Sequence, residues 1–464
     1  MKVKLVGLFF NILFSLNAFE AEKEDPLGTR PNIVVIFTDD QTYQAIGYQN
    51  PKVQTPNLDR LAESGMIFER TYVASPICTA SRASIMTGQF PQKNGVIALN
   101  TRPFTKYTKD DSNHLQLLPN RLREVGYLTA FYGKSHLGDP QKYGFSVGQE
   151  ISGYDDQVTF EKASTFIESQ KNSKEPFFLW VAPRQPHLPL YPTQKWLNKY
   201  PLSSVELPPN FLIEPKDFRI NNQGTPEKVF YRDSKYRNNV GKLPSGPPRD
   251  EETIKAFIQA YYAVVSHLDH QIGQLVNLLA KTGILQKTIV FFLSDNGYHL
   301  GSHGLGNKIT MHEESVRVPM FAFGVGIPKG IKTSSLVSIL DLYPTILELS
   351  GSALPTEKIG GKSLLPLFEN PEAHHHNTIF SECVGVGGKP GEGHRMARND
   401  NYKLILADNN EIFFFDLKND PFEKNNLTHD SQLKKGIIKE QLKLSKHLKV
   451  WMKGIGDRNF PELD

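Results

Sequence analysis

The stretch Ile33-Val-Val-Ile-Phe37, followed at once by Thr38-Asp39-Asp40, decides the fold class of this 464-residue chain. A continuous apolar run rich in β-branched residues is typical of a strand buried on both faces, as in a parallel sheet. The run Ile289-Val-Phe-Phe-Leu293 has the same character and ends in Ser294-Asp295-Asn296-Gly297. We therefore expect both strands to end at the sheet edge where open α/β folds bind their ligands.

Helical patterns separate these strands. We expect helices over residues 57–64, 117–124 and 251–281, and further strands over residues 127–132 and 177–181. The pattern over 251–281 has an apolar stripe that can cover a sheet. Strands that alternate with helices predict an α/β domain over residues 30–356, with a large, mostly parallel sheet flanked by helices.

The pattern changes from about residue 357 onward. Pro and Gly become frequent, and the segments 402–406 and 412–416 are expected to form paired strands, followed by a helix over 431–453. We predict a smaller C-terminal α+β subdomain over residues 357–464, made of a short antiparallel sheet and a helix.

The composition excludes several classes of protein. Hydrophobic residues make up 39% of the chain and charged residues 22%, which is ordinary for a globular protein and excludes a disordered or fibrous one. The 53 basic and 49 acidic residues leave a net charge of +4 without a dense basic run, so nucleic acid is not an expected partner. Two cysteines cannot build a disulfide scaffold or a cysteine-held zinc site.

The N-terminus has the pattern of an export signal. Lys2 and Lys4 precede the apolar run from Leu5 to Leu16, and small residues follow. We interpret residues 1–21 as a cleaved secretory signal peptide, because the apolar run is too short to span a bilayer. The mature protein is therefore expected to be secreted or periplasmic, without a membrane partner.

Acidic side chains follow both apolar strands. Asp39 and Asp40 come after the first strand, and Asp295 and Asn296 come after the second. Adjacent carboxylates repel one another unless a cation neutralises them, and an all-oxygen set suits Ca²⁺ or Mg²⁺. Either pair alone is more often a turn that ends a strand, but two such pairs after two buried strands favour a metal site.

The segment Cys78-Thr-Ala-Ser-Arg82 places a cysteine at the start of a predicted helix. Arg82 lies four residues after Cys78 and therefore on the same helical face. A helix N-terminus favours anions, so Cys78 is a candidate functional residue. The alternative is a buried thiol with a purely structural role.

This segment resembles the signature C-x-[P/A]-x-R of the formylglycine-dependent sulfatases, which belong to the alkaline phosphatase superfamily. A single short motif is a weak indication, but several motifs in one family's order are far more specific. The resemblance covers residues 32 to about 430 and is closest to bacterial polysaccharide sulfatases and the iduronate-type branch. The further matching segments are Asp39-Asp40, Gly133-Lys134-Ser-His136-Leu-Gly138, Pro186-His187-Leu-Pro189, Ser294-Asp295-Asn296-Gly297, Gly304-Leu-Gly-Asn-Lys308 and Tyr402-Lys403-Leu-Ile.

The resemblance implies a modified nucleophile and a metal ion. It implies that a formylglycine-generating maturation enzyme oxidises Cys78 to formylglycine (3-oxoalanine), whose hydrate attacks the sulfur atom. The resemblance also implies a bound Ca²⁺ ion, with Mg²⁺ as the alternative. Its implied ligands are position 78, Asp39, Asp40, Asp295 and Asn296. The other implied catalytic residues are Arg82, Lys134 and Lys308 on the sulfate oxygens, His187 (with Lys308) as the acid for the leaving alcohol, and His136 as the base for the second hydroxyl.

The expected function is a secreted sulfuric ester hydrolase for polysaccharide degradation, acting on a sulfated carbohydrate such as ulvan, carrageenan or a glycosaminoglycan. Two alternatives stay open. One is a phosphonate or phosphate monoester hydrolase of the same superfamily, and the other is a non-catalytic carbohydrate-binding relative. The resemblance leaves open the sugar, the hydroxyl position, endo or exo action, and the oligomeric state.

Some segments are not explained by the family motifs. Arg395 follows the Gly-rich stretch 385–393 and is interpreted either as a grip for a sugar carboxylate or second sulfate, or as part of a solvated loop. The triplet His374–His376 is expected in a solvated loop, with a metal site as the alternative, and Cys383 is expected to be a buried, reduced thiol. Residues 201–250 are interpreted as a flexible excursion or as a substrate-facing loop that carries Arg219, Arg232, Tyr236 and Arg237.

Overall fold

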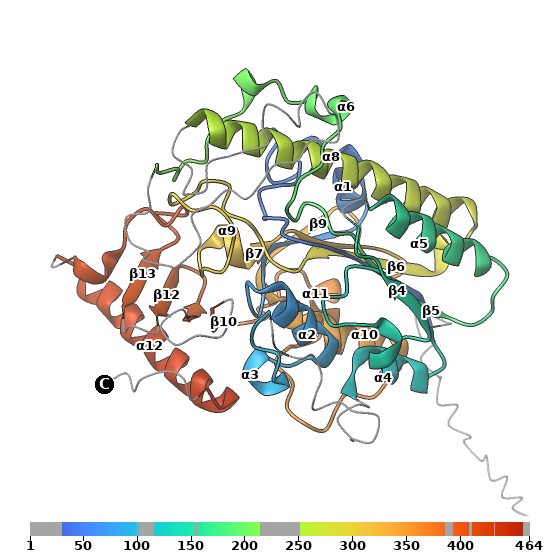
Figure 1. Cartoon of the computed structure of the whole chain (residues 1–464). Helices are drawn as coiled ribbons and strands as arrows, with labels where there is room; N and C mark the ends of the chain where they lie inside the picture. The colour runs from blue at the N-terminus through green and yellow to red at the C-terminus, as the bar shows by residue number, and fades with distance from the viewer. Residues whose placement is uncertain are drawn as a thin grey trace, which may run out of the picture.

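A nine-stranded sheet forms the centre of the computed structural model (Figure 1). The structure describes residues 30–99, 101, 116–153, 156–213, 251–385, 393–407, 411–430 and 432–457. The strand order of the large sheet is β4 (Val147–Glu150), β3 (Leu128–Gly133), β5 (Phe177–Ala182), β1 (Asn32–Thr38), β6 (Thr288–Ser294), β8 (Met320–Gly324), β2 (Met66–Tyr72) and β7 (Arg317–Val318), with β9 (Ile331–Ser338) also paired to β2.

The parallel part of this sheet contains the two strands that the sequence singles out. β1 pairs in parallel with β5 on one side and with β6 on the other. The register of β1 and β6 joins Thr38 to Ser294, so both strands end at the same level. β8 runs antiparallel to its neighbours β6 and β2, which makes the sheet mixed. The predicted α/β class is confirmed.

Helices cover both faces of the large sheet (Figure 1). Phe166 and Leu268 belong to the core on one face, and Leu122 and Ile346 belong to the core on the other. Successive residues of β1 alternate between these two cores, which is why the whole strand is buried. The helices of this part are α1 (Pro56–Glu63), α2 (Cys78–Thr87), α3 (Pro91–Asn94), α4 (Leu118–Glu124), α5 (Gln157–Ser169), α6 (Gln194–Leu197), α8 (Glu251–Lys281), α9 (Glu313–Val316), α10 (Leu342–Ser350) and α11 (Leu365–Glu369).

A second, antiparallel sheet and a long helix form the C-terminal region. The sheet has the order β10 (Ile379–Cys383), β11 (His394–Arg398), β12 (Tyr402–Ala407) and β13 (Ile412–Asp416). Helix α12 (Lys435–Ile455) packs Leu444, Leu448 and Met452 against it. The predicted sheet-plus-helix arrangement is confirmed, with four strands instead of the expected pair. The division of the chain at residues 356 and 357 stays a prediction.

Several sequence predictions concern residues outside the described ranges. These are the signal peptide (residues 1–21), the Gly-rich residues 386–392, and Arg219, Arg232, Tyr236 and Arg237 of the 201–250 segment. Within the described ranges, Cys383 is a buried free thiol, as predicted. No helix of these ranges has the length and apolar character that a bilayer crossing requires.

The solvated-loop prediction for the histidine triplet is wrong for two of its three members. His375 is buried and His376 is largely so, and their Nε2 atoms lie 3.2 Å and 2.9 Å from carboxylate oxygens of Asp341. Asp341 precedes α10 and also accepts the backbone N–H of Ser338. Burial opposes its ionisation, but His376 and His375 hold the pKa of Asp341 at about 2. Asp341, 34 residues before His375 and 35 before His376, is therefore the partner that removes these histidines from solvent.

Both interpretations of Arg395 are wrong. Its side chain is fully buried in strand β11, where Nε donates to Asp457 at 2.5 Å and lies 4.0 Å from Glu382. Its Nη1 donates to the carbonyl oxygen of Cys383 at 2.6 Å. The sequence His-Arg-Met-Ala-Arg of β11 has no apolar alternation, so nothing local indicates a buried strand.

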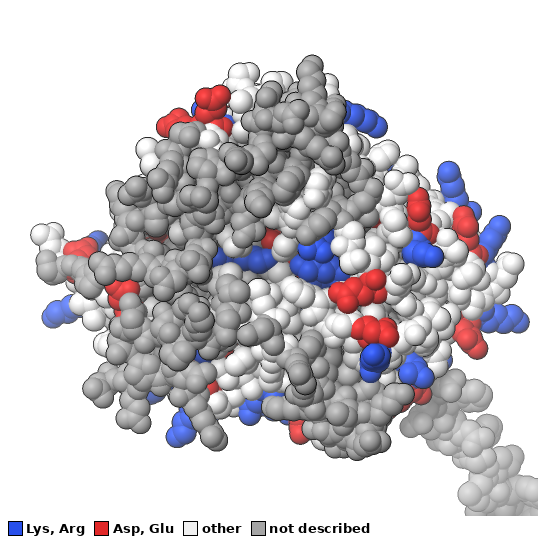
Figure 2. Space-filling model, in the orientation of Figure 1, with Lys and Arg blue, Asp and Glu red and all other residues white. Residues whose placement is uncertain are grey.

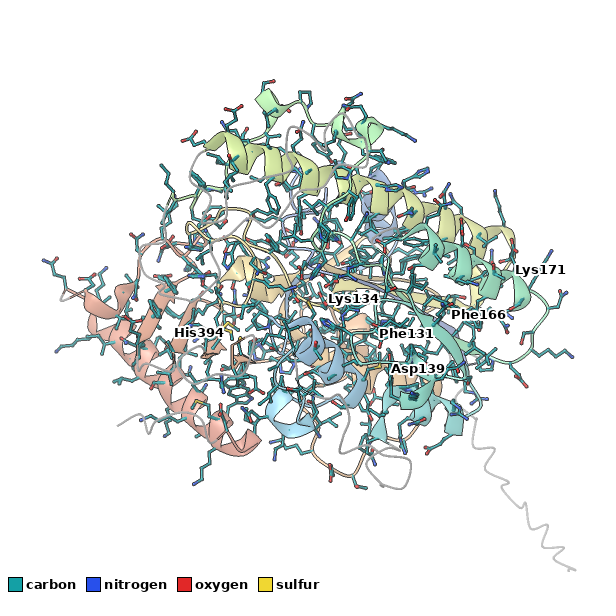
Figure 3. All side chains as sticks on the ribbon, in the orientation of Figure 1. Phe131, Lys134, Asp139, Phe166, Lys171 and His394 are labelled. Atoms are coloured by element: carbon teal, nitrogen blue, oxygen red, sulfur yellow. The ribbon has the colours of Figure 1, made fainter. Side chains whose placement is uncertain are left out.

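We expect Arg395→Ala to lower the free energy of unfolding by about 3–5 kcal/mol, because the change leaves Asp457 buried without its cation. The midpoint of urea unfolding measures this loss. Lys171→Ala, at an exposed site on the far side of the molecule (Figure 3), is the control and should shift the midpoint little. An unchanged midpoint for Arg395→Ala, with a raised KM for a sulfated saccharide, would restore the role as a grip for a sugar carboxylate or second sulfate and refute this assignment.

Candidate active site

Two neighbouring strand ends place the acidic residues side by side. Asp39 and Asp40 follow β1, and Asp295 and Asn296 follow β6, its parallel neighbour. The backbone N–H of Asp40 donates to Asp295 Oδ1 at 3.1 Å, and Asn296 Nδ2 donates to Asp40 Oδ1 at 2.7 Å. All four side chains are fully buried. The structure therefore brings together the four candidate oxygen ligands that the sequence singles out.

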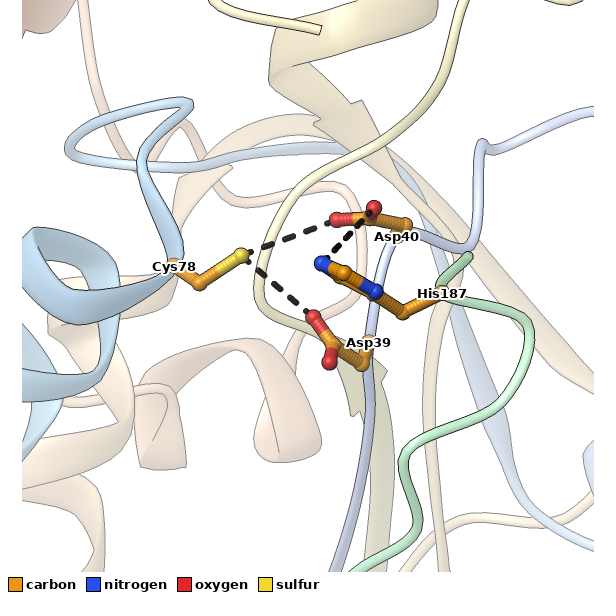
Figure 4. Close-up of side chains that lie close together, drawn as sticks. All are labelled: Asp39, Asp40, Cys78 and His187. Carbon is orange, nitrogen blue, oxygen red and sulfur yellow. Dashed lines mark hydrogen bonds and ion pairs between the residues drawn. The ribbon is translucent and has the colours of Figure 1, made fainter. Parts of the chain in front are cut away.

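Helix α2 presents Cys78 to these carboxylates (Figure 4). Cys78 is the first residue of α2, and its Sγ lies 3.4 Å from Asp39 Oδ1 and 3.7 Å from Asp40 Oδ1. Arg82 lies one turn later and donates Nε to Asp295 Oδ2 at 2.8 Å. The four-residue spacing thus carries the cysteine and the arginine to one site, as expected.

Lys134 enters the site through a turn that requires glycine. Gly133, the last residue of β3, has φ +120°, and a Cβ there would lie 2.0 Å from the carbonyl oxygen of Ala182. This close approach lets the backbone N–H of Lys134 donate to the same carbonyl at 2.8 Å. The Lys134 side chain then lies near the centre of the molecule (Figure 3), with its ammonium on Asp39.

Lys308 reaches the site from the segment that follows β6. Its ammonium contacts Asp40 and lies 2.8 Å from Cys78 Sγ. Its side chain is almost fully buried, at 8% exposure, as is that of Lys134 at 6%. Lysines usually lie at the protein surface, but ion pairs with carboxylates keep these two buried.

Two histidines complete the set that the sequence singles out. His187 Nε2 lies 3.8 Å from Asp40 Oδ2, and its Nδ1 lies 2.5 Å from the carbonyl oxygen of Leu188. Because a carbonyl oxygen can only accept, Nδ1 carries the proton and Nε2 faces the site. The backbone N–H of His136 donates to Glu150 at 3.1 Å, and His136 Nδ1 is buried without a hydrogen-bond partner among the described residues.

Opposite charges balance in this buried cluster. The carboxylates of Asp39, Asp40 and Asp295 meet the cationic side chains of Arg82, Lys134 and Lys308. Burial alone would raise the pKa of Asp39, but the ammonium of Lys134 and the other cations hold it well below its usual range. Burial, and then the charge of Asp295, raise the pKa of the Cys78 thiol well above its usual value.

Three further histidines near the end of β6 form a separate network. His299 Nε2 lies 2.8 Å from Thr310 Oγ1, and His303 Nε2 lies 3.4 Å from a carboxylate oxygen of Glu314. The rings of His303 and His312 stack with their centres 3.9 Å apart. These contacts join the segment around Lys308 to α9, so a structural role accounts for them.

Comparison with known proteins identifies the family. The model of a family described as "Sulfatase" matches residues 31–352, and one described as "N-sulphoglucosamine sulphohydrolase, C-terminal" matches residues 301–450. The chain belongs to the sulfatase family. It is therefore an enzyme of the sulfuric ester hydrolase class.

Curated and solved relatives span nearly the whole sulfatase chain. It is 29% identical to an N-acetylglucosamine-6-O-sulfatase of Bacteroides thetaiotaomicron, covering 86% of this chain and 82% of that protein. It is 26% identical to an ulvan-active sulfatase of Formosa agariphila, covering 90% and 81%. A solved structure in complex with its substrate D-glucosamine-2-N,6-O-disulfate matches with a TM-score of 0.79 at 26% identity, covering 93% of this chain and 99% of that one. The phosphonate monoester hydrolase of Agrobacterium radiobacter, at 18% identity, covers 92% and 96% with a TM-score of 0.75 and shares the fold.

The sulfatase family implies a divalent metal and formylglycine, and the residues present fit the metal. Asp39, Asp40 and Asp295 offer carboxylate oxygens, and Asn296 offers Oδ1, a buried atom without a hydrogen-bond partner among the described residues. Ligand atoms of Asp39, Asp40, Cys78 and His187 all lie within 4.8 Å of one another. Hard oxygen donors of this kind suit Ca²⁺ or Mg²⁺ better than a soft metal.

Tyr261 supports this site although its sequence context indicates only a core residue. Its hydroxyl donates to the carbonyl oxygen of Asp40 at 2.5 Å and accepts the backbone N–H of Thr42 at 3.2 Å. It thereby bridges the turn in which Asp40 has a left-handed φ of 65°. In the sequence, Tyr261 is one member of the apolar stripe of α8, and no signal distinguishes it. It is a positioning residue for Asp40.

We expect chelation to lower the melting temperature of the sulfatase and Ca²⁺ to restore it, because a bound ion stabilises the folded state. Tyr261→Phe should raise the Ca²⁺ concentration needed for this recovery by about tenfold or more, since it removes a support of a ligand residue. Melting curves at graded free Ca²⁺ measure both effects.

Tyr262→Phe is the matched control for this measurement. Its hydroxyl meets Asn50 at 3.4 Å and touches none of the four oxygen ligands, so its Ca²⁺ dependence should equal that of the wild type. Equal Ca²⁺ dependence for both variants would refute the positioning role of Tyr261. A melting temperature that stays constant after verified metal removal would refute the metal site itself.

Proposed function

We propose that this sulfatase is an exported enzyme that removes sulfate from a sulfated carbohydrate, with formylglycine at position 78 and a divalent cation beside it. The observation that carries the proposal is the position of Cys78. It is buried at the start of α2, with Asp39, Asp40 and Lys308 around its Sγ. A reactive group at this position lies beside both the proposed metal ligands and the basic side chains.

The surroundings of Cys78 favour an oxidised cysteine over a thiolate nucleophile. Although the Lys308 ammonium lies 2.8 Å from Sγ, burial and then the charge of Asp295 keep the pKa of the thiol well above its usual value. The hydroxyl groups of a hydrated aldehyde can instead hydrogen-bond to Asp39 and Asp40, which lie within 3.7 Å of Sγ. Hydrated formylglycine supplies the attacking hydroxyl and the cation supplies positive charge for the sulfate oxygens. Helix α2, buried along its whole length, holds position 78 in place.

Arg82, Lys134 and Lys308 form the proposed clamp for the sulfate group. Without an added ion, the three cations offset the three carboxylates. A divalent cation would take over the carboxylates, so that the site carries two positive charges for the departing sulfate dianion. Figure 2 shows Lys and Arg atoms in the middle of one face, between grey segments.

The two histidines are proposed to move protons at defined atoms. His187 Nε2 faces the site on a side chain that is 23% exposed, so it can reach a leaving alcohol at the solvent side. Burial lowers the pKa of His187 to about 4, and the negative charge of a bound substrate opposes this shift, so that His187 can take up a proton in the complex and protonate that alcohol. His136 Nδ1, buried and without a partner among the described residues, is proposed to accept the proton from the second hydroxyl at position 78.

Ca²⁺ is the proposed ion, with Mg²⁺ as the alternative. The ligands come from two strand ends and from α2, and Ca²⁺ accepts such irregular oxygen sets more readily than Mg²⁺, which demands near-ideal octahedral geometry.

A sulfated saccharide is the proposed substrate class. Its support is that the relatives named above are an N-acetylglucosamine-6-O-sulfatase, an ulvan-active sulfatase and a protein in complex with a glucosamine disulfate. A glycosaminoglycan or an algal polysaccharide such as ulvan or carrageenan fits this class.

Export to the periplasm or the medium is proposed from the pattern of the N-terminus. The two lysines and the apolar run up to Leu16 support a cleaved signal peptide over residues 1–21. A maturation enzyme that generates formylglycine is then the partner that the nascent chain requires.

We expect mass spectrometry of the tryptic peptide that contains Cys78 to show conversion of the cysteine to formylglycine when a maturation enzyme is co-expressed. Cys78→Ala should lower turnover of an aryl sulfate by about a thousandfold or more, because it removes the nucleophile. The urea midpoint of this variant should stay near that of the wild type, since alanine is tolerated in a helix. Full activity without conversion would refute the mechanism.

The same preparation separates the two enzyme hypotheses. The wild type should turn over the aryl sulfate faster than the matching aryl phosphate. The opposite order would favour a phosphonate or phosphate hydrolase. Binding of saccharides without turnover of either ester by converted enzyme would favour the non-catalytic alternative.

We expect one class of sulfated saccharide to be desulfated with a kcat/KM well above that of an aryl sulfate, because contacts to the sugar add binding energy at the transition state. A screen of defined sulfated oligosaccharides from ulvan, carrageenan and glycosaminoglycans, read out as released sulfate, measures this. Release from the aryl sulfate alone would refute the carbohydrate assignment.

A further inference from the structure

The outer face of α12 carries a row of lysines that the catalytic site does not use. This lysine stripe consists of Lys435, Lys439, Lys443, Lys446, Lys449 and Lys453. At about 3.6 residues per turn these side chains fall within roughly a third of the helix circumference. The opposite face of α12 packs Leu444, Leu448 and Met452 on the second sheet (Figure 1). The stripe therefore points away from the body of the enzyme.

The charge pattern of the stripe opposes helix formation. The pairs Lys435–Lys439, Lys439–Lys443 and Lys449–Lys453 are like charges at a spacing of four residues, which destabilises a helix by a few tenths of a kcal/mol each. Lys435 is the first residue of α12, where the helix dipole favours negative charge, and the first turn has no acidic residue. Folding of α12 gives no reason for such a pattern.

Acidic neighbours do not neutralise most of the stripe. Glu440 is the one acidic residue of α12, and it lies 3.9 Å from Lys443. Lys435, Lys439, Lys446 and Lys453 are exposed, and they form no ion pair with any acidic residue of the described ranges. The six charges of the stripe exceed the net charge of +4 of the whole chain. Positive charge is thus concentrated on this one face.

We propose that the lysine stripe binds a sulfated polysaccharide chain at a site separate from the catalytic centre. This inference rests on the proposed function, in which the substrate is a sulfated carbohydrate. The eighteen-residue span from Lys435 to Lys453 gives a straight row of about 27 Å, long enough for several consecutive sugars. A polyanion on this row relieves the repulsion between the lysines and releases condensed counterions.

Binding at α12 would hold one polymer chain on the enzyme between catalytic events. A chain held at one place on the enzyme presents its other sulfates at a high local concentration, so the stripe lowers KM for a polymer. A small aryl sulfate cannot reach the stripe and the catalytic site at the same time, so the stripe does not lower its KM. The stripe thus distinguishes polymeric from small substrates, which the sulfate clamp does not.

An anionic membrane is the competing occupant. Ile438, Leu442 and Val450 are 41%, 66% and 66% exposed and lie on or beside the lysine face, as in a helix that rests on a lipid surface. Three apolar side chains stand among six lysines, so charge dominates this face. The sulfated polymer is therefore the occupant we favour.

The test compares two full-length variants that lose the same charge. The stripe variant carries Lys435→Gln, Lys439→Gln, Lys446→Gln and Lys453→Gln, because glutamine keeps the helix propensity of lysine. The control variant carries the same change at four exposed lysines elsewhere, namely Lys142, Lys171, Lys329 and Lys332. Melting curves establish that both variants fold.

Binding to heparin and to dextran sulfate is measured at graded salt. We expect the stripe variant to bind at least about tenfold more weakly and to lose about 3 in the slope of log affinity against log salt, by analogy with phosphate contacts. The control variant should bind like the wild type. Its KM for a polymeric substrate should also stay unchanged, whereas the stripe variant's KM rises at constant aryl sulfate turnover.

Three other binding results overturn the proposal. An equal loss in both variants assigns the effect to net charge, and no loss in either removes the stripe as a site. Lost binding to phosphatidylglycerol vesicles with intact heparin binding assigns the stripe to a membrane. If the wild type turns over no sulfate ester, the proposed function fails, but the binding comparison still decides whether the stripe holds a sulfated polymer.

Discussion

Mutual repulsion of three buried carboxylates is the constraint on which the rest of the structure depends. Asp39, Asp40 and Asp295 meet at the ends of two adjacent strands, where water cannot screen them. Isolated charges at this depth would be strongly unfavourable, so positive charge must come to them. Three cations supply it: Arg82 from α2, Lys134 from the end of β3 and Lys308 from the segment after β6. The same three cations form the clamp that we propose for the sulfate group.

The scaffold around this cluster has to be precise because the carboxylates tolerate little displacement. The shared register of β1 and β6 fixes Asp39 against Asp295. The hydroxyl of Tyr261 holds the left-handed turn at Asp40 from the far side, and Gly133 lets β3 approach β5 closely enough to turn Lys134 inward. Each support is a backbone or hydroxyl contact, so the carboxylate oxygens stay available for the chemistry.

The C-terminal region is attached by ion pairs to the segment that carries Lys308. Lys403 of β12 is fully buried, bridges Glu313 and Glu423 at 2.7 Å and 2.8 Å, and donates to the carbonyl oxygen of Met311 at 2.9 Å. It therefore anchors the second sheet to the segment that carries Lys308. This contact gives a physical reason for the Tyr402-Lys403 motif.

Local patterns in the sequence determined the fold class, the two strand ends and the motif residues, because apolar periodicity and short motifs are properties of neighbouring residues. The same patterns failed for Arg395, His375 and His376, and they were silent on Tyr261. Each of these side chains takes its role from a partner far away in the chain: Asp457 lies 62 residues from Arg395, Asp341 lies 34 residues from His375, and Asp40 lies 221 residues from Tyr261. Whether a polar side chain is solvated or buried against such a partner is decided only when the sheets and helices pack, and only the tertiary structure could assign these residues.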